Sequence, residues 1–249
     1  MENAISTACQ ITDVNVDVFS KTKFPRIALL SRSYSGRNEA IKTICHALKG
    51  QFYQVFVHAI SESADKFFET FIPSNRISSK RNFNQLRKMY SEHIKRKEFY
   101  EAKVALGKMS IDEAQKECQM LIILDDLVFL GDLVFYDDLI KQIWINGCHD
   151  WITVMVTLHS PDEGGPIVRN QSDWVVTWYD PSETNQKRFY KKWIDYFPSF
   201  RAFKEVYNEI TSEHKCMVAR KSGGGGLEIE NNIFFWQPTR IEGGFSFLQ

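Results

Sequence analysis

The segment Met120–Leu127, with the sequence MLIILDDL, constrains the fold more than any other part of the chain. A strand with one face in water alternates apolar and polar residues, whereas a strand covered on both faces is apolar throughout. The unbroken apolar run before Asp125 and Asp126 therefore predicts a strand in the buried centre of a parallel sheet. The two aspartates are then expected at the carboxyl end of that strand.

Apolar runs of strand length alternate with longer helical patterns along most of the sequence, and this alternation predicts an α/β fold. We expect a mostly parallel sheet with helices on both faces and right-handed crossovers. The expected strands are Arg26–Leu30, Tyr53–Ile60, Met120–Leu127, Ile152–His159, Asp173–Tyr179, Met217–Ala219 and Ile233–Trp236. The expected helices are Glu39–Leu48, Ser63–Phe71, Leu133–Ile145, Glu183–Tyr196 and Ser199–Ile210, with residues 80–118 leaning to helix.

The domain organisation predicted from these patterns is simple. Residues 1–23 form an N-terminal extension, and residues 24–249 form a single domain with a basic helical insertion near 76–118. Ser222–Gly226, with the sequence SGGGG, is expected to be a flexible turn. It is not a phosphate-binding loop, because no strand-to-helix transition flanks it.

Charge is balanced overall but unevenly distributed. The 31 Lys and Arg residues equal the 31 Asp and Glu residues, so net charge gives no indication of a polyanionic partner. Basic residues outnumber acidic ones from Arg76 to Lys108, whereas residues 120–140 contain acids and no Lys or Arg. This asymmetry is typical of a nucleic-acid-binding face, and equally of a solvated helix beside an acidic site.

Cysteine usage and hydropathy predict an intracellular, soluble protein. The five cysteines are scattered without a CxxC pair, so we expect reduced thiols and neither a zinc site nor a disulfide framework. No apolar run reaches membrane-spanning length, and the N-terminus lacks the pattern of a signal peptide.

The turn Ser31–Asn38 follows the first expected strand and precedes the first expected helix, which is the layout of a phosphate-binding loop. Gly36 fits the second glycine of such a loop. Arg37 replaces the lysine, and Asn38 offers a carbonyl oxygen where a hydroxyl normally ligates magnesium. The helix N-terminus remains an anion site with any side chains. The candidate phosphate-binding residues are Ser33, Ser35, Gly36, Arg37 and Asn38. The turn is a nucleotide site with altered chemistry, one that has lost activity, or an accident of composition.

Three further positions are candidates for catalysis. In P-loop ATPases, an acidic pair ending a buried strand supplies a magnesium carboxylate and a base that orients water, although a plain acidic turn has the same sequence. His159 ends the next strand and either contacts a γ-phosphate or is structural. Arg169 either reaches a nucleotide in a neighbouring subunit or pairs with an acid such as Asp173.

Read in order, several segments resemble one family, the poxvirus-type genome-packaging ATPases of nucleocytoplasmic large DNA viruses, which belong to the FtsK–HerA class of P-loop translocases. The resemblance covers roughly residues 24–238. The segments are FPRIALL with its loop and helix, QFYQVFV, LIILDDL, NGCHDWITVMVTLHS, PIVRNQSDWVV and NNIFFWQP. The resemblance implies a RecA-like P-loop NTPase, with a three-layer αβα sandwich around the sheet.

The resemblance also implies an activity and partners: ATP-driven translocation of double-stranded DNA by a homo-oligomeric ring, with capsid or portal proteins as further partners, in the virion or the viral factory of the host cytoplasm. It assigns the phosphate loop to Gly36, Arg37 and Asn38. It assigns magnesium to Asn38 and Asp125, and the catalytic role to Asp126. His159 falls at a glutamine sensor position, and Arg169 matches a family arginine. ATP and Mg²⁺ are the implied cofactors.

The sequence departs from the family pattern at four positions. Arg37 stands for lysine, Asn38 for threonine or serine, His159 for glutamine, and Cys148 for the arginine of a Gly-Arg-His segment. These departures leave open a second hypothesis, a catalytically inactive paralogue that serves as a DNA-binding or structural subunit of the virion. A small-molecule kinase is a third hypothesis. It would require an arginine-rich lid, but the basic stretch Arg76–Lys108 is long and precedes the acidic strand.

Overall fold

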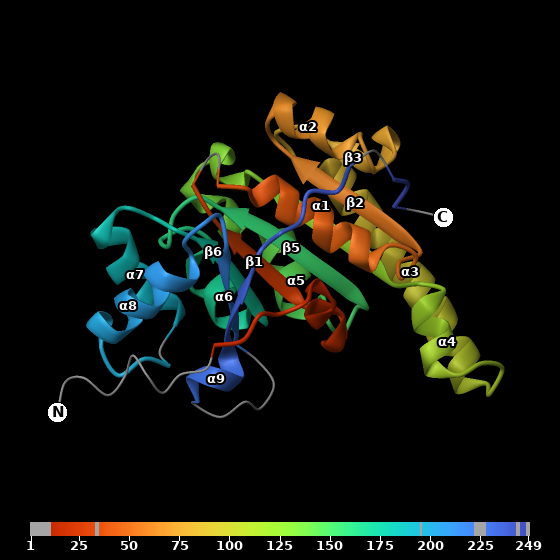
Figure 1. Ribbon diagram of the computed structural model, residues 1–249. Coiled ribbons are helices and arrows are strands. Elements are labelled where there is room, and N and C mark those ends of the chain that lie inside the picture. The colour runs from red at the N-terminus through yellow and green to blue at the C-terminus, as the bar shows by residue number, and fades with distance from the viewer. Residues whose placement is uncertain (1–10, 33–34, 195, 222–227, 243–244, 248–249) are drawn as a thin grey trace.

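The computed structural model describes residues 11–32, 35–194, 196–221, 228–242 and 245–247. Ser33 and the predicted turn Ser222–Gly226 therefore lie outside the described residues. The described chain forms an eight-stranded sheet with helices on both faces (Figure 1). This arrangement confirms the predicted α/β fold class.

The strand order in the sheet is β3-β2-β4-β5-β1-β6-β7-β8. The strands are β1 (Arg26–Leu30), β2 (Gln54–Ala59), β3 (Ile77–Ser78), β4 (Met120–Asp125), β5 (Ile152–Leu158), β6 (Trp174–Trp178), β7 (Cys216–Arg220) and β8 (Ile233–Trp236). The pairs from β3 to β6 are parallel, and β7 and β8 add antiparallel strands at one edge. Every residue of β4 is buried, as expected for a strand covered on both faces.

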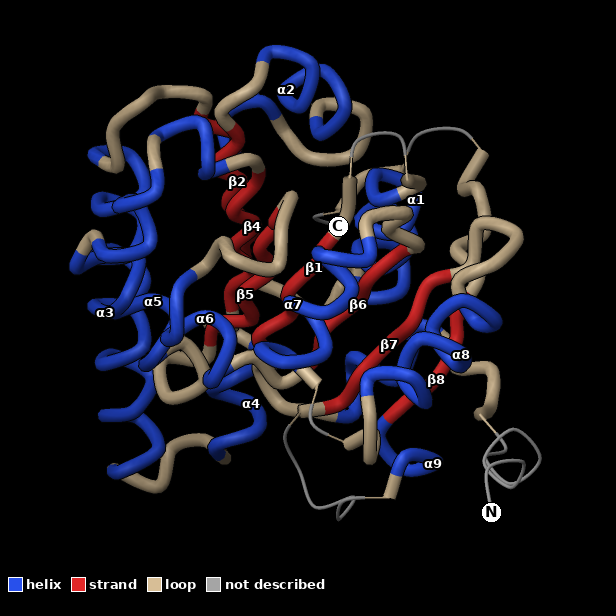
Figure 2. Tube along the Cα trace, turned by 90° about the vertical axis from the view of Figure 1, so that its left-hand side faces the viewer, coloured by secondary structure: helices blue, strands red, loops and turns tan. Residues whose placement is uncertain are grey.

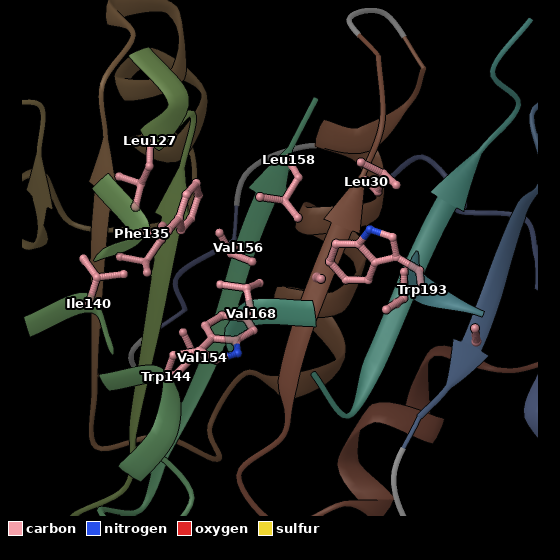
Figure 3. Close-up of a cluster of buried hydrophobic side chains, with 14 of the residues drawn as sticks. Leu30, Leu127, Phe135, Ile140, Trp144, Val154, Val156, Leu158, Val168 and Trp193 are labelled. Carbon is pink, nitrogen blue, oxygen red and sulfur yellow. The ribbon is translucent and has the colours of Figure 1, made fainter. Parts of the chain in front are cut away.

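Alternate strand residues face two separate cores. One core contains Ile122, Val154 and Val156 together with α5 and α6 side chains such as Trp144 and Val168 (Figure 3). The other packs the opposite face of the same strands against α1 and α2. The helices are α1 (Arg37–Leu48), α2 (Glu62–Phe68), α3 (Asn84–Ala105), α4 (Ile111–Lys116), α5 (Asp138–Asn146), α6 (Gly165–Gln171), α7 (Glu183–Trp193), α8 (Phe200–Ile210) and α9 (Ile229–Asn232). Figure 2 shows α3 and α5 on one side of the strands and α1 on the other.

Two helix predictions are corrected by the structure. The expected helix Leu133–Ile145 is two elements, a 3₁₀ turn (Asp132–Tyr136) and α5. The break falls at Asp137, whose carboxylate accepts the Leu139 N–H at 2.8 Å and so caps α5. The helix α6 was not predicted, because its Gly-Pro start resembles a turn. Gly164 adopts a left-handed φ of 79° as the N-cap, and a proline occupies the first turn, where its missing N–H costs nothing.

The two ends of the described chain pack on the face of the sheet that carries α1. Phe19 is buried and meets Trp174 and Trp236 edge-on, at centroid distances of 5.6 and 6.1 Å. After β8, residues 237–242 and 245–247 form a C-terminal strap over the outer side of α1 (Figure 1). Within the strap the Ile241 carbonyl accepts a hydrogen bond from the Lys42 ammonium at 2.9 Å, and Phe245 stacks on Phe71 at 5.2 Å.

No described helix is both long enough and apolar enough to cross a membrane.

Candidate functional site

The candidate site lies where the carboxyl ends of three parallel strands meet. β5 pairs with β1 on one side and with β4 on the other. The turn that begins at Ser31 follows β1, the acidic pair follows β4, and His159 follows β5. Because the strands run in the same direction, these three segments share one edge of the sheet, which is where α/β folds generally bind ligands.

The turn after β1 places a cation directly against the acidic pair. Gly36 has φ 95°, a conformation that favours glycine, and it is the N-cap residue of α1. The first helical residue is Arg37, and its Nη2 lies 3.0 Å from Asp126 Oδ1 and 3.9 Å from Asp125 Oδ1. The turn and the acidic strand therefore converge on one site.

The backbone of Asp126 explains how two adjacent carboxylates reach the same cation. Successive residues of an extended strand point to opposite faces of the sheet. Asp126 leaves the extended conformation with φ 55° and ψ 32°, so its carboxylate comes to the same guanidinium as that of Asp125. A left-handed conformation costs a non-glycine residue about 1–2 kcal/mol. Such local strain is often found at functional sites.

Side chains from β5 and the following loop fix the acidic pair. The Thr157 hydroxyl donates to Asp125 Oδ1 at 2.7 Å and accepts the Asp126 N–H at 2.9 Å. His159 Nε2 lies 2.8 Å from Asp126 Oδ1, so Asp126 contacts both Arg37 and His159 through one oxygen. The His159 N–H donates to Glu163 Oε2 at 2.7 Å, which holds the tip of β5.

The two aspartates have opposite pKa shifts. Burial, reinforced by the neighbouring Asp126 charge, raises the pKa of Asp125. Burial alone would also raise the pKa of Asp126, but the hydrogen bond from His159 and the Arg37 charge outweigh it and lower that pKa. Asp126 is thus the carboxylate that is held in its ionised form. Asp125 takes up a proton more readily, and a cation bound beside it would favour its ionised form.

Several polar atoms around the turn are buried without a partner among the described residues. They include three donor side chains, Arg37 Nη1, Trp178 Nε1 and Ser35 Oγ, and also Ser31 Oγ at the end of β1. One carboxylate oxygen of Glu39, in the first turn of α1, is likewise unpaired. Buried polar groups in native proteins are nearly always satisfied, so a cluster of unpaired donors beside a helix N-terminus is typical of an anion site.

The remaining predicted residues lie outside this cluster or on its border. Asn38 is exposed in the first turn of α1. Arg169 lies on α6 and contacts the Asp162 backbone oxygen at 3.5 Å. The pairing of Arg169 with Asp173 is not formed, because Asp173 is bound by Arg26 at 3.0 Å through Nε.

The residues present fit a phosphate group, since their unpaired donors point to an anion. Magnesium is normally held by one or two carboxylates together with phosphate oxygens and water. Asp125 and Asn38 are the side chains that could hold such an ion together with a nucleotide. Among the described residues, no group of three His, Cys, Asp or Glu side chains could hold a metal ion by itself. The Arg37 guanidinium competes with a cation for the same carboxylates.

Sequence reasoning missed Thr157, Glu163 and Trp178. Thr157 could have been recognised from the sequence, because a hydroxyl within the otherwise mostly apolar β5 requires a hydrogen-bond partner when it is buried. The role of the Trp178 indole could not have been recognised from the sequence, because its position against the turn depends on β6 lying beside β1.

Sequence comparison finds relatives among viral proteins. No model of a known protein family matches the sequence. The chain is 29% identical over 119 residues to the uncharacterized protein L437 of Acanthamoeba polyphaga mimivirus, covering 47% of this chain and 41% of the relative. It is 20% identical over 102 residues to the uncharacterized protein 075L of Invertebrate iridescent virus 6, covering 41% and 40%. The chain thus spans about two fifths of the length of each curated relative it matches.

Structural comparison finds a genome packaging NTPase, a conjugation coupling protein solved with an ATP analogue, and a protein with ATPase domains. The genome packaging NTPase B204 of Sulfolobus turreted icosahedral virus 2, solved with AMPPCP, has a TM-score of 0.57 and 13% identity, covering 88% of this chain and 100% of B204. The pCW3 conjugation coupling protein TcpA has a TM-score of 0.59 and 12% identity, covering 88% and 61%. EssC of Geobacillus thermodenitrificans has a TM-score of 0.58 and 10% identity, covering 88% and 41%. The chain therefore has the fold shared by the viral packaging NTPase B204, TcpA and EssC.

Proposed function

We propose that this protein is an ATP-binding, ATPase-like subunit that acts on double-stranded DNA during its translocation. The observation that carries the proposal is the contact between Arg37, at the start of α1, and Asp126, at the end of β4. This contact joins a phosphate-loop-like turn to an acidic strand in the fold of nucleotide-binding translocases.

The triphosphate would lie on the first turn of α1. Arg37 Nη1, Ser35 Oγ and Trp178 Nε1 are the unpaired side-chain donors there, and the helix N-terminus adds its own positive potential. Magnesium, when bound between Asp125, Asn38 and the phosphates, would neutralise charge that develops on the phosphate oxygens. Arg37 can bind phosphate through Nη1 while Nη2 keeps its contact with Asp126.

Asp126 and His159 are the residues proposed to position the attacking water. The low pKa of Asp126 keeps it an ionised acceptor. His159 is held at the tip of β5 by Glu163, so the imidazole stays beside the carboxylate. Arg169, which does not contact the acidic pair, is proposed to act on the nucleotide of a neighbouring subunit in a homo-oligomeric ring.

A specific observation favours the second candidate, an inactive paralogue. The guanidinium of Arg37 is already bonded to the proposed catalytic acid, whereas a working site needs that carboxylate free for water. In this version the protein binds nucleotide without hydrolysing it and serves as a DNA-binding or structural subunit of the virion.

The DNA contact is proposed to lie on α3 and the segment before it. The exposed basic residues from this segment to the loop after α3 are Lys80, Arg81, Arg87, Lys88, Lys95 and Lys108. Phosphate neutralisation by such residues releases counterions, so DNA affinity should fall steeply with salt. Binding that does not change between 50 and 200 mM salt, roughly the range over which such contacts weaken, would exclude this surface.

The most specific form of the proposal is that the translocation serves genome packaging into a capsid, with capsid or portal proteins as further partners. The support is that B204 is a genome packaging NTPase and that the sequence relatives are viral proteins. The corresponding location is the virion or the viral factory.

The test measures ATP binding and hydrolysis by the wild-type chain and by the double variant Arg37→Lys, Asn38→Thr, with magnesium present. Hydrolysis by the wild type supports the active enzyme, and hydrolysis only by the double variant supports the inactive paralogue. The absence of ATP binding at millimolar nucleotide in both proteins would reject both versions.

A further inference from the structure

A second groove adjoins the candidate phosphate site on the side away from the acidic pair. It has a volume of about 430 Å³ and runs from the turn before α1 to the loop between α8 and β7. The residues that matter along it are Ser35, Trp178, Tyr179, Asn208 and Lys215. A ligand seated on the turn can therefore extend into this groove without crossing a layer of the fold.

Trp178 links the groove to the turn. Its side chain ends β6 and is only 4% exposed, yet its Nε1 has no partner among the described residues. That nitrogen lies 3.8 Å from the place where a Cβ on Gly36 would stand, so it is directed at the turn. The Ser35 hydroxyl, which borders the same groove, is also buried and unpaired. A buried indole N–H normally has an acceptor, and here the acceptor is missing.

Tyr179 and Asn208 give the groove an aromatic and an amide surface. Tyr179 is 50% exposed, although it follows a buried strand, and its ring stacks on Tyr207 with centroids 6.5 Å apart. Tyr207 is buried and fixes that ring from behind. Asn208, the next residue of α8, is exposed; its Oδ1 accepts from Gln186 Nε2 at 3.5 Å, and its amide NH₂ is a donor on the same edge. This combination is suited to a flat heterocycle with polar edges.

The far end of the groove is formed by a strained turn. Glu213 and His214 are consecutive non-glycine residues with φ 54° and 63°. Both border the groove. Left-handed conformations at two such residues in succession are unfavourable and persist where the surrounding structure holds them, commonly at ligand sites.

We propose that this groove binds the nucleoside part of the triphosphate, with the base stacked on Tyr179 and its edge hydrogen-bonded by Asn208. The inference rests on the proposed nucleotide site and extends it from the phosphates to the base. Trp178 Nε1 and Ser35 Oγ then lie between the two halves of the ligand and contact the phosphate end. The groove selects a nucleotide over a bare polyphosphate, and its polar edge selects among bases.

The experiment compares ATP with tripolyphosphate by calorimetry, using the folded full chain and the variants Tyr179→Ala, Tyr179→Phe and Tyr136→Ala. Tyr136→Ala is the matched control, because Tyr136 is 52% exposed and borders a different groove. Loss of base stacking should weaken ATP binding by roughly tenfold or more in Tyr179→Ala. Tripolyphosphate binding should not change, Tyr179→Phe should restore ATP affinity, and Tyr136→Ala should match the wild type.

Two outcomes overturn the inference and are distinguishable from each other. Wild-type protein that binds ATP no more tightly than tripolyphosphate, or Tyr179→Ala that retains full ATP affinity, would exclude the groove while leaving the phosphate site intact. Wild-type protein that binds neither ligand would reject the nucleotide site itself. Trp178→Phe adds a separate readout, because removal of the indole N–H should weaken both ligands equally.

Discussion

Two polar clusters lie at opposite ends of the same parallel strands, and they differ in how completely their groups are paired. At the amino ends, Arg26 donates to Asp173 through its N–H at 2.9 Å, Nε at 3.0 Å and Nη2 at 3.2 Å. Arg26 Nη1 donates to Gln171 at 3.1 Å. At the carboxyl ends, Arg37 reaches Asp126 through Nη2 but leaves Nη1 buried without a partner.

A second polar contact at the amino ends joins α3 to Asp150 and is less complete, because His93 Nδ1 is buried without a partner among the described residues. The Tyr90 hydroxyl donates to Asp150 Oδ2 at 2.6 Å, and His93 Nε2 lies 2.6 Å from the Asp150 backbone oxygen. These bonds tie α3 to the loop before β5. A polar cluster that satisfies itself stabilises the fold, whereas one that retains buried donors is prepared for a ligand. The comparison of Arg26 with Arg37 therefore separates stability from binding at the two ends of one sheet.

The largest expected effect is on stability, from Arg26→Met at the amino ends. The change leaves Asp173 buried without its cation, and breaking such a pair typically costs about 3–5 kcal/mol. Urea unfolding should show this loss, whereas ATP affinity, measured under conditions where the variant is folded, should equal that of the wild type. A loss of unfolding free energy below about 1 kcal/mol would remove the distinction between the two ends.

The matched change at the carboxyl ends is Arg37→Met, and its main effect should be on binding. Loss of a hydrogen bond to a charged phosphate should weaken ATP binding by about 2 kcal/mol, or roughly 30-fold. The unfolding free energy should fall less than in Arg26→Met, because Asp125, whose pKa is already raised, can take up a proton. Equal ATP affinity in the variant and the wild type would contradict the proposed role of Arg37.

A smaller effect on stability is expected from Tyr90→Phe. The variant keeps the ring and removes the hydroxyl that donates to the Asp150 carboxylate, so the expected loss is about 2 kcal/mol. Differential scanning calorimetry should report the lower stability, and ATP titration should report no change. Tyr100→Phe is a suitable control, because among the described residues its hydroxyl has one hydrogen bond, accepted from Arg96 on the same helix.

The smallest expected effect is a change in the pH dependence of stability in Asp125→Asn. In the wild type the folded pKa of Asp125 is raised above the ordinary value of 3.8, so the folded state binds the proton more tightly than the unfolded state. Stability contributed by this group is therefore present at low pH and falls as pH rises through the raised pKa. Asparagine does not titrate, so the stability of the variant relative to the wild type should increase over that range. A difference that is constant with pH would show that Asp125 is not perturbed.

The sequence was sufficient to predict the layers of the fold and most strands. Strands buried on both faces require continuous apolar runs, and β4 and β5 have them. The break at Asp137 was not predicted, because a capping aspartate inside an amphipathic pattern looks like a polar helix face. The α6 helix was missed because glycine and proline at a helix start have the same sequence as a turn.

The candidate site could be predicted only in part. The turn and the acidic pair could be recognised from the sequence, since each follows a strand and contains residue types typical of phosphate and metal sites. The structure places Arg37, Asp125, Asp126 and His159 together, whereas their catalytic roles stay predictions. Trp178 and Tyr179 could not be recognised as site residues, because their proximity to the turn depends on the order of strands in the sheet. Nothing in the local sequence specifies that order.

The C-terminal strap has a consequence for how the protein is made. The Lys42 ammonium and the Ile241 carbonyl are separated by 199 positions along the chain. The outer surface of α1, the helix that begins at Arg37, is thus completed only after residues 199 positions further along the chain have been synthesised. During translation much of the sheet can assemble while this helix is still uncovered, so the ability to hold a ligand at its N-terminus should be acquired only after the strap has been synthesised.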